Sequence, residues 1–412
     1  MTQTINSAIL VFLGFLTLGL TASAAESEVP EPFRGFDDKS KYSISYDDLT
    51  AVLNTVVVDV GLSTRREAQE AADVTGTRLK TKVKKTANEG NRFYFETFDE
   101  EEGGQEFLRN IQKSLEQLPS TAPLKYFSRD EQLAYWLNLY NVTVLNEIIA
   151  VYPKKNLKKL IKGRNSIYSK KLLTVAGIPL SLNDIQYNIL NNNYDNNPLI
   201  IYGLYQGIIG GPNIRKRAYT GATVYEDLES NAYEFINSNR GTYMQRSGTF
   251  EVSSLYDRNR EYFPDFEADL TAHLSQYLRA NELEQLQTAT KIVPDIDDWS
   301  VTDLMGTHQR IGGSFATSRA ALLDSMKSTV PMNDGTPLDG ATLGASIGYG
   351  SANVAAQGAT LARIDPNLLV ILKELDDKRN AENLRNAAVT IEDLDETQQE
   401  PTPEEATDLE ED

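Results

Sequence analysis

The stretch SRDEQLAYWLNLYN, residues 128–141, decides the fold because it opens the clearest helix in the sequence. Ser128 and Glu131 have the spacing of a capping box, in which the hydroxyl accepts from a free backbone N–H and the Glu side chain reaches back to the N-cap. An apolar stripe at helical spacing follows, and Pro153 is expected to end the helix. The stripe consists of Leu133, Leu137, Tyr140, Val144, Ile148 and Val151.

Shorter elements are predicted on both sides of this helix. Ser181 and Asp184 have the spacing of a second helix cap, and residues 172–180 read as two short strands around a glycine turn. The further expected helices cover residues 42–60, 106–118, 224–235 and 266–278, and the strand candidates cover residues 92–98, 198–204 and 249–253. Helices dominate and no βαβ series is present, so the sequence predicts an α+β fold, mostly helical with a few short strands forming a small sheet.

The chain divides by composition into a folded body and less regular ends. A leader at residues 25–41 precedes an α+β domain at 42–286, and a C-terminal extension follows at 287–333. Residues 334–360 are rich in Gly, Ala and Ser, which predicts a flexible linker before a helix at 361–390. Residues 391–412 contain eleven acids and no base, which predicts a disordered acidic tail.

The first residues indicate export. Residues 8–20 are an uncharged apolar run, and Ala22-Ser23-Ala24 follows as a small-x-small cleavage pattern. This layout is typical of a secretory signal peptide at residues 1–24, with cleavage after Ala24. We therefore expect a periplasmic or secreted protein with no membrane span after cleavage. The alternative is an uncleaved N-terminal anchor, because no Lys or Arg precedes the apolar run.

Composition excludes several classes of chemistry. The 412 residues contain no Cys, which rules out disulfides, cysteine catalysis and Cys-ligated metals. Two histidines are present, His273 on an expected helix, where a packing role is expected, and His308 in loop surroundings. The net charge of −19 argues against general nucleic-acid binding. We expect no residues for nucleophilic or metal-dependent catalysis, no metal site and no cofactor.

Two short motif matches are weak. Residues 344–348 fit the Gly-x-Ser-x-Gly nucleophile elbow, but no convincing strand precedes them and both histidines come earlier in the chain. Residues 295–298 resemble the start of a calcium loop, but lack the Gly and the closing Glu that such a loop requires. A helix cap before Trp299 is the preferred interpretation of the second match.

A basic segment, residues 154–171, stands out in this acidic chain. It contains eight Lys and Arg residues and no acid. The simplest interpretation is a solvated face. The alternative is an anion-binding patch for phosphate groups, acidic polysaccharide or the acidic tail of the chain.

The sequence resembles the core of the bacterial domain of unknown function family 547 between residues 128 and 254. The resemblance is carried by residues 128–141, Tyr152-Pro153, residues 173–185, Gly210-Gly211-Pro212, residues 218–221 and residues 252–255. With flanking helices it covers about residues 42–278. The family has no established activity, so the resemblance implies a fold and not a reaction.

The chain departs from the pattern of this family at one loop. Members often carry a His, then Asn-Cys, then Gly-Cys-Pro, where this chain has Ile201, Tyr205-Gln206 and Gly210-Gly211-Pro212. Any chemistry that the family performs with the Cys and His is therefore impossible here. The loop is expected to serve as a binding surface or as structure.

These observations favour a non-catalytic binding or envelope-associated protein. The proposed binding residues are Trp136, Asn138, Tyr140 and Asn141 on the capped helix, and Tyr205, Gln206 and Arg215 around the glycine-rich loop. Aromatic faces and amides suit a saccharide or a peptide, and an anionic envelope component is a further candidate partner. The competing interpretation of this set is that Trp136 and Tyr140 are core residues and that Asn141 holds a loop.

Two other classes of protein stay open. A carboxylate-dependent hydrolase acting on envelope polymer or peptide would use residues such as Glu147 and Asp184, if they meet in a cleft. An envelope scaffold would use the basic segment and the acidic tail for contacts with partners. The identity of the ligand and the oligomeric state are not encoded in any motif.

Overall fold

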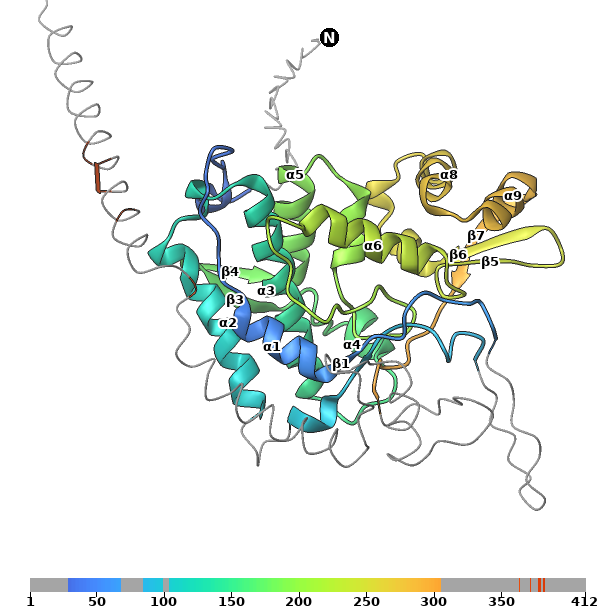
Figure 1. The fold of residues 1–412 in the computed structure, drawn as a ribbon, viewed down its shortest axis with the longest axis horizontal. Helices are drawn as coiled ribbons and strands as arrows, with labels where there is room; N and C mark the ends of the chain where they lie inside the picture. The colour runs from blue at the N-terminus through green and yellow to red at the C-terminus, as the bar shows by residue number, and fades with distance from the viewer. Residues whose placement is uncertain are drawn as a thin grey trace, which may run out of the picture.

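The computed structural model describes residues 29–67, 84–98 and 104–304, together with positions 363, 371, 377, 378 and 381. These residues form the predicted α+β fold, in which helices predominate and the strands are short (Figure 1). The α-helices are α1 (Asp47–Val56), α2 (Gly104–Thr121), α3 (Arg129–Ile149), α4 (Lys158–Lys162), α5 (Asn191–Asn193), α6 (Val224–Ile236), α7 (Ser254–Arg258), α8 (Phe266–Tyr277) and α9 (Ala280–Thr288). The strands are β1 (Val57–Val58), β2 (Arg92–Phe93), β3 (Lys171–Val175), β4 (Ile178–Ser181), β5 (Thr242–Met244), β6 (Thr249–Ser253) and β7 (Lys291–Ile296).

Helix α3 runs through the middle of the body, between α2 and α6 (Figure 1). It is buried on nearly every face, because α2, α6 and a π-helical turn (Asp184–Leu190) pack around it. Its N-cap is Ser128, whose hydroxyl accepts from the N–H of Glu131 at 3.2 Å, as predicted. The helix ends at Ile149, one turn before Pro153.

The second half of the predicted capping box is wrong. The carboxylate of Glu131 accepts from the N–H of Ile44 at 2.9 Å and from the N–H of Gly221 at 3.1 Å, so it does not reach back to Ser128. These two bonds join the N-terminal segment and the segment before α6 to the start of α3. Gly221 is required here because a Cβ atom at this position would collide with Glu131. Tertiary contacts have thus replaced the local cap.

The strands form three small sheets. Strands β1 and β2 pair antiparallel, and β3 and β4 form the predicted hairpin around Ala176 and Gly177, both with positive φ. The third sheet has the order β5-β6-β7, in which β6 pairs antiparallel with β5 and parallel with β7. Strand β7 was not predicted, because only its pairing with β6 distinguishes its sequence from a loop.

Two other local predictions are wrong. Residues 198–204 form a 3-10 helix (Pro198–Gly203) instead of a strand, because Pro198 starts the turn and the side chain of Asn197 caps it. No helix begins at Trp299. Residues 299–304 instead run as an extended segment between the basic segment, the glycine-rich loop and β2, with bridges Asn156↔Ser300, Ile208↔Val301 and Phe93↔Asp303.

Several predicted segments lie outside the described residues. These are the signal segment at 1–24, His308, the elbow-like residues 344–348, the linker at 334–360 and the acidic tail at 391–412. Within the described part, no helix is both long enough and apolar enough to cross a membrane. Arg363 is buried against the body, where its guanidinium donates to Asp48 Oδ2 at 2.6 Å.

Candidate functional site

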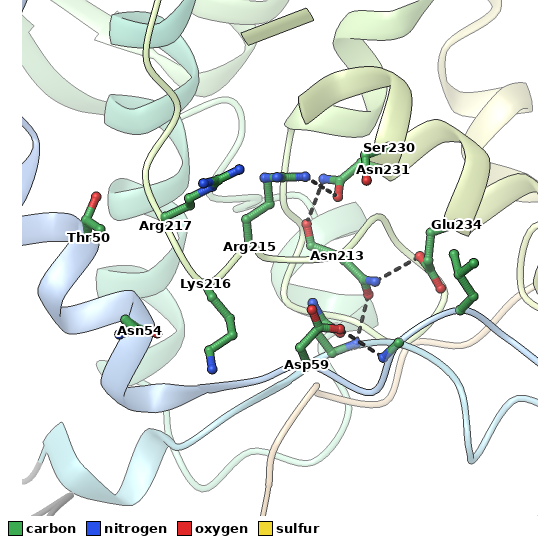
Figure 2. Close-up of a pocket in the computed structure, with 13 residues that line it drawn as sticks. Thr50, Asn54, Asp59, Asn213, Arg215, Lys216, Arg217, Ser230, Asn231 and Glu234 are labelled. Carbon is green, nitrogen blue, oxygen red and sulfur yellow. Dashed lines mark hydrogen bonds between the residues drawn. The ribbon is translucent and has the colours of Figure 1, made fainter. Parts of the chain in front are cut away.

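A polar cavity of about 590 Å³ opens between α1, α6 and the segment at residues 213–217 (Figure 2). Thr50 and Asn54 line it from α1, and Ser230, Asn231 and Glu234 line it from α6. The remaining lining residues are Asp59, Gly61, Leu62, Asn91, Asn213, Arg215, Lys216 and Arg217. Its lining therefore combines amides, hydroxyls and charges, with no aromatic ring.

The segment at 213–217 is held at both ends. Asn213 Oδ1 accepts from the N–H of Asn91 at 2.8 Å, and its amide donates to Glu234 at 2.8 Å. Beyond the segment, the N–H of Ala218 donates to the hydroxyl of Thr50 at 3.2 Å. Three consecutive basic residues, Arg215 to Arg217, thus lie along a fixed stretch of backbone facing the cavity.

The three cations differ in how far they are neutralised. Arg215 is ion-paired with Asp227 and also donates to the carbonyl of Asp227 at 3.1 Å. Arg217 is largely exposed and lies 3.7 Å from the same carboxylate. Lys216 makes no ion pair with any carboxylate that the structure describes. Among the described residues, its ammonium group is therefore the cation of the cavity lining with no carboxylate partner.

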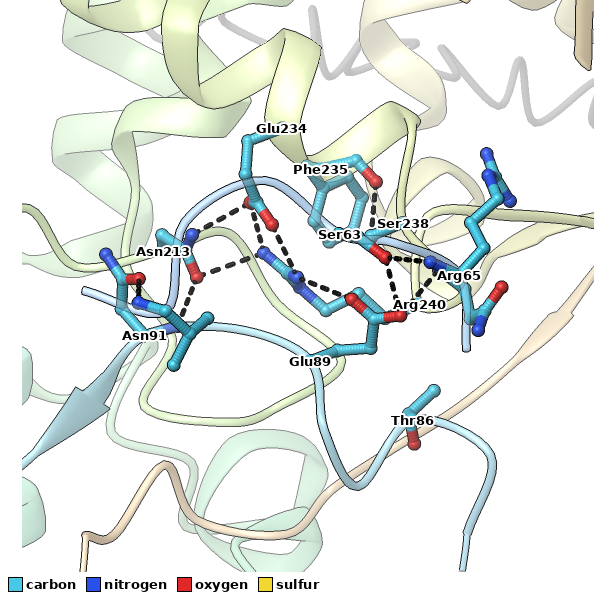
Figure 3. A network of polar contacts seen from close by, with 12 residues as sticks. Ser63, Arg65, Thr86, Glu89, Asn91, Asn213, Glu234, Phe235, Ser238 and Arg240 are labelled. Atoms are coloured by element: carbon cyan, nitrogen blue, oxygen red, sulfur yellow. Dashed lines mark hydrogen bonds and ion pairs between the residues drawn. The ribbon is translucent and has the colours of Figure 1, made fainter. Parts of the chain in front are cut away.

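A buried ion network supports the cavity from behind (Figure 3). The guanidinium of Arg240 is fully buried, donates to Glu234 Oε1 at 2.9 Å and to Asn213 Oδ1 at 3.0 Å, and lies 3.9 Å from Glu89. Burial raises the pKa of Glu234, and the Arg240 ion pair opposes that shift. Because both oxygens of Glu234 accept from Arg240, this carboxylate is not free to take a proton from a ligand.

The rim formed by Asp59, Gly61 and Leu62 is also anchored. Ser63 donates to Glu89 at 2.8 Å, and Arg65 donates to the carbonyl and the hydroxyl of Thr242 at 2.7 and 2.8 Å. Arg65 is in addition ion-paired with Glu282 at 3.1 Å. Asp59 Oδ1 accepts from the N–H of Gly61 at 2.8 Å, which shapes the turn at the rim.

Of the seven residues proposed from the sequence, only Arg215 lines the cavity. Trp136 is fully buried, edge-on to Phe33, and Tyr140 is buried and stacked on Tyr168. Their placement agrees with the competing interpretation, in which both are core residues.

The two asparagines of α3 bind backbone. Asn138 exchanges hydrogen bonds with both polar groups of the Tyr219 backbone, at 2.8 and 2.9 Å. Asn141 donates to the carbonyl of Gly203 at 2.9 Å and accepts from the N–H of Tyr205 at 2.9 Å. Each amide thereby fixes one loop to α3.

The remaining pair lies in the loop after the 3-10 helix. Tyr205 is buried with its hydroxyl bonded to Thr302, and Gln206 accepts from Arg258 at 2.9 Å. Ligand binding by these residues stays a prediction. Sequence reasoning missed Asn54, Lys216 and Arg217, although the run of three basic residues at 215–217 was a usable signal.

The other titratable candidates are separated from the cavity. His273 is buried, its Nε2 lies 2.8 Å from the hydroxyl of Tyr202, and burial lowers its pKa to about 4. This is the expected packing role. Partial burial raises the pKa of Glu147. Although burial opposes it, bonding to Lys171 and Ser181 lowers the pKa of Asp184. In the described part of the chain no contact joins these two carboxylates, and neither lines the cavity.

The donor set does not indicate a metal. Among the residues that the structure describes, no three His, Asp or Glu side chains gather closely enough to hold a metal ion. The cavity lining contains two carboxylates, Asp59 and Glu234, and three cations. This arrangement can bind a polar anion through charge and hydrogen bonds.

Residues 124–236 match the family model described as a protein of unknown function, DUF547. The match runs from the turn before α3 to the end of α6, so it contains the central helix and both the 213–217 and the α6 walls of the cavity. The resemblance seen in the sequence is therefore confirmed for this domain. No curated protein and no solved structure shows significant similarity to the chain.

Proposed function

We propose that this DUF547 domain is a binding module whose cavity takes a small, anionic, hydroxyl-rich molecule such as a sugar acid or a sugar phosphate. The observation that carries the proposal is the cavity of about 590 Å³ with the unpaired Lys216 between two arginines on its wall. A cavity of this size suits a ligand of a few hundred daltons. The charge of Lys216 would attract the acid group of the ligand.

The remaining lining supplies partners for hydroxyl groups. Asn54 is exposed on the cavity wall, and its side chain makes no hydrogen bond with any residue that the structure describes, so both polar atoms of its amide are available to a ligand. Thr50 and Ser230 add hydroxyls, and Asp59 adds a carboxylate that can accept from a ligand hydroxyl. Because the lining has no aromatic ring, affinity would rest on hydrogen bonds and charge instead of stacking.

The state of the carboxylates supports binding over hydrolysis. A general acid or base must reach the reacting group and exchange a proton with it. Glu234 is held by hydrogen bonds from Arg240 and Asn213. The other carboxylate in the lining is Asp59, at the rim. The lining therefore lacks the pair of free carboxylates that a carboxylate-dependent hydrolase would use.

Isothermal titration of the full chain tests the proposal. The probes are glucuronate and glucose 6-phosphate, with glucose as the neutral counterpart. We expect saturable binding of at least one acid and much weaker binding of glucose. Lys216→Gln should weaken the acid at least tenfold, whereas Lys113→Gln removes the same charge from an exposed position on α2 and should leave binding unchanged. Equal affinities of wild type and Lys216→Gln would contradict the assignment of this cavity.

We also propose that the protein is exported to the periplasm or the exterior. The support is the apolar run at residues 8–20 followed by Ala22-Ser23-Ala24. Mass spectrometry of the protein from its native host should show an N-terminus at Ala25. Recovery of intact Met1 in membranes would instead support the N-terminal anchor.

A further inference from the structure

Three cations surround the ring of Trp299. The ammonium groups of Lys158 and Lys162 lie 5.8 and 5.1 Å from the ring centroid, and the guanidinium of Arg258 lies 4.9 Å from it. Trp299 itself is 5% exposed and forms the floor of this cluster. None of the four residues lines the cavity described above.

The positive charges of the cluster have no carboxylate in direct contact in the described part of the chain. No carboxylate there lies within ion-pair distance of Lys158, Lys162 or Arg258. Asp297 reaches Arg258 through the hydroxyl of Ser254, and Asp257 acts on it at longer range. Within residues 154–171, Lys171 has an ion pair, with Asp184, and the other seven basic residues have no described carboxylate partner. Like charges gathered around one ring repel one another, and an anion among them would relieve that repulsion.

Hydrogen bonds hold the backbone that carries the cluster and the guanidinium of Arg258. The N–H of Leu157 donates to the carbonyl of Trp299 at 2.9 Å, and the N–H of Val301 donates to the carbonyl of Lys155 at 3.0 Å, so the base of α4 is tied to the Trp299 segment. Arg258 donates to Gln206 at 2.9 Å and to Ser254 at 2.5 Å. Burial lowers the pKa of Arg258, the direction expected for a guanidinium without a contacting carboxylate.

We propose that Lys158, Lys162 and Arg258 form a binding site for a phosphate group, separate from the cavity of the proposed function. A phosphate monoester carries up to two charges and three terminal oxygens, so it can engage three cations at once, whereas a carboxylate offers one charge and two oxygens. Gln206 accepts a hydrogen bond from Arg258 and so positions its guanidinium for this role. The phosphate can belong to a soluble molecule or to a lipid headgroup.

Calorimetric titration of the full chain with tripolyphosphate at low salt is the direct test. We expect saturable binding that Lys162→Gln weakens five- to twentyfold. Lys159→Gln is the matched control, because Lys159 is exposed on the same helix but does not lie over the ring. Tryptophan fluorescence adds a local readout, since the other tryptophan, Trp136, is fully buried in the core. The emission of Trp299 should change with the same affinity as the heat signal.

The outcomes distinguish a specific phosphate site from non-specific electrostatic attraction. Equal weakening by Lys159→Gln and Lys162→Gln, or equal affinity for polyglutamate and tripolyphosphate, would overturn the phosphate site. Vesicles containing phosphatidic acid identify the source. Binding to them that is lost in Lys162→Gln points to a lipid phosphate, and binding of tripolyphosphate alone points to a soluble one. Lys162 does not line the cavity, so Lys162→Gln should leave glucuronate binding intact, and failure of the cavity proposal and failure of this one are distinguishable.

Discussion

The amides of α3 and the amides of the cavity look alike in the sequence but occupy opposite situations in the structure. Asn138 and Asn141 are buried, and the polar atoms of each amide are hydrogen-bonded to the backbone of a neighbouring loop. Asn54 is exposed on the cavity wall, and its amide has no hydrogen-bond partner among the residues that the structure describes. An amide on a helix is therefore informative about binding only when its hydrogen bonds are accounted for. Substitutions in the two regions should affect different quantities, stability in α3 and ligand affinity in the cavity.

The largest effect on stability is expected at Trp136, in the buried core around α3. Trp136→Ala removes a fully buried side chain that packs edge-on against Phe33 and Tyr135, and should lower the free energy of unfolding by about 3–5 kcal/mol. Chemical denaturation with circular dichroism measures this. Trp136→Phe, which keeps a ring in the site, should cost less. If Trp136→Ala left the free energy of unfolding unchanged, the side chain of Trp136 would not be part of the buried core around α3.

The next largest effect concerns pH and His273, which is buried on α8. Its pKa in the folded protein is about 4, below the ordinary value of about 6.5. Between these values the unfolded chain binds the proton and the folded chain does not, so the free energy of unfolding should fall as the pH drops from about 6.5 to about 4. The contribution is on the order of 3 kcal/mol across this window.

Denaturation of wild type and His273→Gln at pH 7, 5.5 and 4.5 isolates this contribution. The neighbours of the imidazole are the hydroxyl of buried Tyr202, the buried ring of Phe263 and the half-buried ring of Tyr277, none of which titrates in this range. The variant should therefore lose less stability on acidification than the wild type. Parallel loss in both proteins would show that other groups carry the pH dependence.

The sequence predicts the main helices well because their signals are local. The cap at Ser128 and the apolar stripe after it locate α3, and the hairpin of β3 and β4 follows from the turn at Ala176 and Gly177. Predictions failed where a tertiary partner competes with a local one. Glu131 has the residue type and spacing of a capping box, but the N–H groups of Ile44 and Gly221 take its carboxylate.

The cavity was only partly predictable for a related reason. Arg215 was selected from its place beside the glycine-rich loop, whereas Asn54 and Asp59 reach the same cavity from about 155 residues earlier in the chain. Nothing in the spacing of α1 indicates that it faces residues 213–217. The hydrogen bond from Ala218 to Thr50 that brings them together depends on the complete fold.

A smaller effect is expected at Asn141. Asn141→Ala leaves the carbonyl of Gly203 and the N–H of Tyr205 without their partner, and should lower the free energy of unfolding by about 1–3 kcal/mol. Urea denaturation measures the loss. Because Asn141 does not line the cavity, ligand affinity measured on the folded variant should stay unchanged. If Asn141→Ala were as stable as the wild type but bound the ligand more weakly, Asn141 would be a ligand-binding residue and not a structural one.

The smallest effect on stability is expected at Asn54, the open counterpart of Asn141. Asn54→Ala breaks no described hydrogen bond, and Ala is the better helix former, so the free energy of unfolding should change by less than about 0.5 kcal/mol. The same change should weaken the acid ligand of the cavity several-fold, because the amide faces the space that the ligand would fill. Asn54→Ala and Asn141→Ala form a matched pair, because each removes one amide, the first from the cavity wall and the second from α3. Both variants should be titrated with the ligand and denatured under the same conditions. If Asn54→Ala lowered stability as much as Asn141→Ala does, its amide would be bonded within the protein, and the cavity wall would lose its one free amide.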